Sequence, residues 1–151
     1  MRSFRLLLVL LSFSASLLAA DSPFSGIWKF NPSKGHLTPP IPKSVLVHIA
    51  ADTENFKFSE EGVDEKGQPF KSSYEAKFDG KDYPTTGNPD SDSVSLRRVN
   101  EREIKFTTKK AGKVVSKLDV IVSKDGQITT VNYTDYSQGK TDKGSAVYDK
   151  Q

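Results

Sequence analysis

Four side chains stand out as groups that could hold a small molecule: Trp28, Tyr74, Arg98 and Tyr148. The three aromatic rings offer apolar area, and a guanidinium can bind an anionic group through two parallel hydrogen bonds. Each has a structural alternative. Trp28 would also serve as a large apolar plug of the core, and Arg98 would either stack on Trp28 or lie in water beyond its strand. These four residues are our candidates for ligand binding.

Residues for catalysis or metal binding are few. The chain has no cysteine, and neither His36 nor His48 has a second imidazole or a carboxylate at a ligand spacing. There is no Gly-x-Ser-x-Gly turn for a serine nucleophile. Residues 88–92 imitate the start of a calcium loop, but Ser93 and Val99 stand where the loop needs glycine and glutamate. The sequence therefore predicts no catalytic residues, no metal site and no cofactor.

The elements that must position these side chains are strands. From Phe70 to Phe78, apolar and hydroxyl-bearing residues alternate with polar ones, which is typical of a half-buried strand. On this strand Ser72 and Tyr74 place hydroxyls among apolar neighbours. Because unpaired hydroxyls are unfavourable in a dry core, they favour a cavity, although rim positions that reach solvent would explain them too.

The same alternation recurs along the chain, and turn signals such as Asp79-Gly80 and Asp125-Gly126 separate the runs. This pattern predicts an all-β fold of about nine strands, arranged as an antiparallel meander. In residues 127–136 the pattern leaves open which side chains face inward. We interpret the adjacent acids Glu60 and Glu61 as part of a solvated hairpin.

The first twenty residues have the pattern of a signal peptide, with Arg2 and Arg5 before the apolar run Leu6–Leu11 and a small-residue end at Ala19-Ala20. We therefore expect a signal peptide over 1–20, one domain over 21–151, and a secreted or periplasmic protein. Cleavage leaves 20 basic and 19 acidic residues, a net charge of +1. Such a balance argues against nucleic-acid binding, and no later apolar run is long enough to predict a membrane span after cleavage.

Two ends of the predicted domain carry a resemblance. The segment Phe24–Phe30 contains a Gly-x-Trp motif, and Ala146–Lys150 is a short strand with a tyrosine. Together with Asp79–Pro84 and Gly87–Asp90, these segments resemble small secreted bacterial lipocalin-like proteins of the calycin superfamily, with distant similarity to lipocalins and fatty-acid-binding proteins. The resemblance implies that the strands close into an antiparallel up-and-down β-barrel of about eight or nine strands, and it implies no particular ligand. Ala146 stands where fatty-acid-binding proteins have the arginine of their carboxylate clamp, so that clamp is not implied.

The sequence thus predicts a non-catalytic binding protein that holds a small hydrophobic or amphipathic ligand inside its barrel. The alternative is a filled barrel without a pocket, acting as an envelope or extracellular protein-interaction or structural module through its loops, chiefly Asp82–Asp92. The two hypotheses differ in one physical property, which is whether the barrel interior is hollow. The sequence points to no particular protein partner.

Overall fold

The protein is described by a computed structural model that covers residues 22–137 and 139–151. The predicted signal peptide, residues 1–20, lies outside the described residues. The described part is all-β, as predicted, and every pair of neighbouring strands is antiparallel. Its strands are β1 (Gly26–His36), β2 (Ser44–Ala51), β3 (Asn55–Val63), β4 (Pro69–Lys77), β5 (Tyr83–Pro84), β6 (Ser93–Asn100), β7 (Glu103–Lys110), β8 (Lys113–Val122), β9 (Ile128–Asp135) and β10 (Asp142–Lys150).

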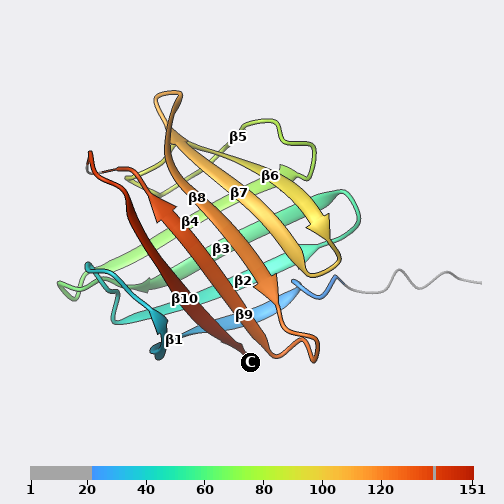
Figure 1. Cartoon of the computed structure of the whole chain (residues 1–151), viewed down its shortest axis with the longest axis horizontal. Coiled ribbons are helices and arrows are strands. Elements are labelled where there is room, and N and C mark those ends of the chain that lie inside the picture. The colour runs from blue at the N-terminus through green and yellow to red at the C-terminus, as the bar shows by residue number, and fades with distance from the viewer. Residues whose placement is uncertain (1–21, 138) are drawn as a thin grey trace, which may run out of the picture.

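The strands form one sheet in the order β4-β3-β2-β1-β10-β9-β8-β7-β6-β5, which curls into a nearly closed barrel. In Figure 1, β6–β10 cross in front of β1–β4, so the barrel has two walls with an interior between them. The predicted antiparallel barrel is confirmed. The structure has ten strands rather than eight or nine, because the predicted loop Asp82–Asp92 contains the two-residue strand β5.

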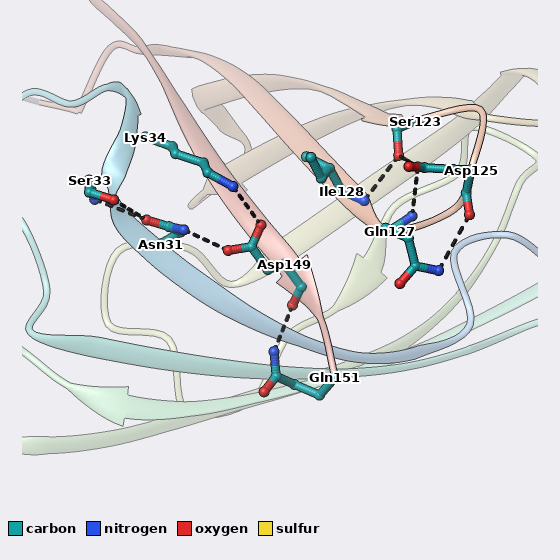
Figure 2. Close-up of polar contacts among 9 residues, drawn as sticks. All are labelled: Asn31, Ser33, Lys34, Ser123, Asp125, Gln127, Ile128, Asp149 and Gln151. Carbon is teal, nitrogen blue, oxygen red and sulfur yellow. Dashed lines mark hydrogen bonds and ion pairs between the residues drawn. The ribbon is translucent and has the colours of Figure 1, made fainter.

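The first and last strands join the two walls. The β1–β10 ladder pairs Trp28 with Lys150 and Phe30 with Tyr148, and it resumes at Gly35 after an irregularity. Asp149 strengthens this join from the outside: Asn31 Nδ2 donates to one carboxylate oxygen at 2.6 Å, and Lys34 Nζ donates to the other at 3.1 Å (Figure 2). These hydrogen bonds hold the pKa of Asp149 below its usual range.

The opposite join is a seam between β4 and β6. Two isolated bridges cross the seam, Ser73 with Thr86 and Asp79 with Arg97, in place of a continuous ladder. The Ser73–Thr86 bridge consists of a reciprocal pair of backbone hydrogen bonds, both 2.9 Å long. The loop between β5 and β6 therefore completes the wall that the strands themselves leave open.

The core occupies one part of the interior. Phe24, Trp28, Phe56, Leu96 and Ile104 are among its largest buried side chains. The indole Nε1 of Trp28 donates to the backbone oxygen of Phe24 at 2.8 Å, so the ring is buried without an unpaired donor. Burial of each such side chain contributes about 1.5–3 kcal/mol, which is the main stabilisation of this fold.

The facing of β9 is now settled. Thr129 and Val131 line the barrel interior, and the Tyr133 hydroxyl accepts a hydrogen bond of 3.0 Å from the backbone N–H of Thr38. Tyr136, beyond the end of β9, is exposed. Among residues 22–137 and 139–151, no helix has the length and apolar character needed to cross a membrane.

Candidate functional site

The barrel interior holds a cavity of about 210 Å³ beside the packed core. It lies between the two walls, and residues of both walls and of the β5–β6 loop line it. Most of the lining is aromatic or aliphatic: Trp28, Val47, Ile49, Phe56, Phe58, Tyr74, Val94, Phe106, Leu118, Val120, Val131 and Tyr148. The polar lining residues are Glu60, Thr85, Asn88, Ser91, Thr108 and Thr129.

The strand register explains why Glu60 is among them. Trp28 pairs with Val47, Val47 with Glu60, and Glu60 with Ser72, so these four residues form one row across β1–β4. Along β3, Glu60 also has the parity of Phe56 and Phe58, which point inward. Glu60 is therefore placed in the cavity by the same alternation that buries its apolar neighbours.

The Glu60 carboxyl is held by one protein group among the described residues. The hydroxyl of Ser72 donates to Oε1 at 2.6 Å across the β3–β4 ladder. Burial raises the pKa of Glu60, and the Ser72 hydrogen bond opposes that shift in part. The residue is partly exposed and lines the cavity.

Our interpretation of Glu60 and Glu61 as a solvated pair was therefore wrong for Glu60. Glu61 points outward and pairs with Lys71 at 3.0 Å, as expected on a solvated face. The sequence did contain a signal for Glu60, which is its spacing of two from Phe58 and four from Phe56.

Two tyrosines face the carboxyl from different walls. Tyr74 stacks on Phe58, with ring centroids 4.7 Å apart and planes 13° from parallel, and Tyr148 packs against Phe30 at 5.6 Å. Burial, and secondarily the negative charge of Glu60, raises the pKa of both tyrosines. Both hydroxyls therefore stay protonated at neutral pH and can donate hydrogen bonds.

The β5–β6 loop closes the cavity next to the seam. Thr85, Asn88 and Ser91 contribute to the lining, and the Thr85 hydroxyl donates to the backbone oxygen of Ser91 at 2.9 Å. Gly87 lies at the point where the loop crosses β4. Its φ is +79°, and a Cβ there would run into the backbone oxygen of Lys71. Only glycine allows this close contact without strain.

Of the four side chains that we predicted for ligand binding, the structure brings three together. Trp28, Tyr74 and Tyr148 all line the cavity. Arg98 does not. Its guanidinium donates to the backbone oxygen of Asp52 at 2.6 Å and lies 4.1 Å from the centroid of Phe78. It faces inward, as its parity with Leu96 suggested, but at the barrel end where it covers an aromatic ring other than Trp28.

Family models, curated proteins and solved structures were all compared with the chain. None of them matched it significantly. The chemistry of the cavity is therefore the basis for the function proposed below. A single carboxyl among aromatic rings offers one strong acceptor, with hydroxyl donors nearby, inside a largely apolar volume.

Proposed function

We propose that this is a secreted or periplasmic, non-catalytic binding protein that holds a small hydrophobic or amphipathic molecule inside its barrel. The observation that carries the proposal is the 210 Å³ cavity, with an apolar wall and a few polar groups. Cavities of comparable size lined by apolar side chains take up a benzene ring. The expected ligand is therefore a single-ring or short-chain molecule.

We further propose kinship with the lipocalin-like proteins that the sequence resembles. The features that support it are an up-and-down antiparallel barrel, a buried Gly-x-Trp tryptophan on β1, and pairing of the first strand with the last. Binding within the barrel accords with this kinship.

Binding can be tested with two uncharged probes, toluene and benzyl alcohol. A ligand that binds only the folded state raises the unfolding temperature, and saturation at about 100 times Kd adds about 2.7 kcal/mol of stability. We expect a saturable rise with at least one probe. Native mass spectrometry of protein purified from its host is expected to show a small-molecule adduct as well.

Two variants make the experiment specific to the cavity. Val131→Phe would fill the space beside Val120 and is expected to abolish the response to the probes. Arg98→Ala removes a side chain outside the cavity and is expected to keep it. Circular dichroism checks that both variants fold. If the wild-type protein shows no adduct and no rise with either probe, the filled-barrel alternative replaces this proposal.

A further inference from the structure

We infer that the cavity selects a small molecule with a basic nitrogen, an amine, over one with a carboxylate, through the Glu60 carboxyl in its wall. This inference rests on the proposed function and specifies the class of its ligand. It follows from the charge of the lining, the free bonding capacity of Glu60, and the rings around it.

The charge of the lining is one-sided. Among the described residues that line the cavity, Glu60 is the only carboxyl, and none is Lys, Arg or His. Arg98, the arginine that shares the inward parity of Leu96 on its strand, donates instead to the backbone oxygen of Asp52 at the barrel end. A ligand carboxylate would enter without a counter-charge and would meet a second acid in a low-dielectric space. Such burial is strongly unfavourable.

The bonding capacity of Glu60 is incomplete. Ser72 occupies Oε1, and no other described residue donates to the carboxyl. An ionised carboxylate accepts about four hydrogen bonds, so most of its capacity is not used by the described residues. A ligand ammonium would supply both the missing donors and the missing positive charge, which makes the buried pair far more favourable than the lone carboxylate.

The rings around Glu60 favour the same ligand. Tyr74 and Phe58 present a stacked pair on one side, and Tyr148 lies on the facing wall. Aromatic faces attract cations, and the attraction is stronger when the site excludes water. The two tyrosine hydroxyls can also donate to a neutral oxygen on a ligand. An alcohol is therefore expected to bind, but more weakly than an amine.

Four probes with one ring and different head groups test the inference: benzylamine, benzyl alcohol, toluene and benzoate. The dissociation constants of the four probes for the full chain are measured by titration calorimetry at pH 7 and compared with one another. We expect benzylamine to bind at least about tenfold more tightly than benzoate. The buried carboxylate attracts the ammonium and repels the benzoate, and the effect of this difference on affinity exceeds tenfold.

Glu60→Gln keeps the shape of the side chain and removes its charge. In this variant we expect the dissociation constants of benzylamine and benzoate to differ by no more than about twofold, because the buried charge that distinguishes them is gone. Glu61→Gln, one residue away on the outer face, is the matched control and is expected to keep the wild-type ratio. The ranking in the wild-type protein tests the inference even if a variant folds poorly.

The outcomes separate the two claims. If toluene or benzyl alcohol binds but benzoate equals or exceeds benzylamine, the amine inference is wrong and the binding proposal stands. The same holds if Glu60→Gln keeps the full preference for benzylamine. If none of the four probes binds, both claims are wrong.

Discussion

Glu60 illustrates how one side chain can be unfavourable for folding and useful for binding. Its neighbours in the row are Val47 and Ser72, and its carboxyl has a single hydrogen bond from the protein. Burial disfavours its ionised form and raises its pKa. A carboxyl that is costly in the empty cavity gains most from a ligand that neutralises it.

The raised pKa gives a prediction about stability. The folded state holds the Glu60 proton more tightly than the unfolded state, whose glutamate pKa is about 4.3. Stability from this group is therefore present below that pH and is lost as the pH rises through the raised pKa. Glu60→Gln carries no such charge, so its unfolding temperature relative to wild type is expected to rise between about pH 4 and pH 7.

This prediction is checked by thermal unfolding across that pH range, with Glu61→Gln as the control. Tyr74 and Tyr148, the titratable groups that face Glu60, remain neutral throughout because their pKa values are raised. If the unfolding temperatures of Glu60→Gln and wild type change with pH in the same way, the Glu60 carboxyl is solvated in the folded state.

At the scale of the elements, the barrel has one strong join and one weak join. The β1–β10 ladder is continuous except at one irregularity, and Asn31 and Lys34 both bond Asp149 across it. The β4–β6 seam depends on two bridges, and the loop carrying Thr86 supplies one of them. Because backbone hydrogen bonds without neighbours open more easily, local opening is expected at the seam.

Hydrogen exchange tests this difference directly. The amides of Ser73 and Thr86, which form the seam pair, are expected to exchange faster than those of the β1–β10 ladder. Gly87→Ala puts a Cβ against the Lys71 backbone at a φ of +79°. It should lower the free energy of unfolding by about 1–3 kcal/mol and speed exchange at both seam amides.

Gly126 provides the matched control for that variant. It has a similar φ of +70°, but a Cβ there meets nothing within 4 Å. Gly126→Ala therefore introduces the backbone strain without the contact at the seam, and exchange at Ser73 and Thr86 is expected to be unchanged. If amide exchange at Ser73 and Thr86 speeds up equally in both variants, the seam is no weaker than the rest of the barrel.

For the whole molecule, some of the aspartates act in the direction opposite to Glu60. Hydrogen bonds lower the pKa of four of them, chiefly from the Asn55 side chain for Asp52, the Lys81 backbone for Asp79, the Ser123 hydroxyl for Asp125 and the Asn31 side chain for Asp149. A lowered pKa gives stability that is present above the unfolded value and is lost as the pH falls through the folded value. The protein should therefore be most stable at a weakly acidic pH.

Asp149→Asn tests the acid side of this prediction. The variant loses the ion pair with Lys34 and the carboxylate acceptor for Asn31. In urea denaturation at about pH 7 it is expected to be less stable than wild type, and at about pH 2 the two should converge, because protonated Asp149 no longer attracts Lys34. A deficit of equal size at both pH values would rule out a contribution from the charge of Asp149.

The sequence alone determined the type of every element except β5, and the inward set of side chains on most strands. Period-two alternation is a local property of a strand, so Phe70–Phe78 could be assigned without any partner. The inward position of Tyr74 followed from it. The same rule would have found Glu60, whose parity with Phe56 and Phe58 is visible in the printed sequence.

Only the tertiary structure decided how the strands were joined and which inward residues met. Parity along one strand does not specify the neighbour across the barrel, since that depends on register and closure between distant segments. Arg98 shares the inward parity of Leu96, yet closure at Asp79–Arg97 places it at the barrel end beside Phe78. Glu60 on β3 and Tyr148 on β10 are far apart in the sequence, and the β1–β10 ladder brings them to one cavity.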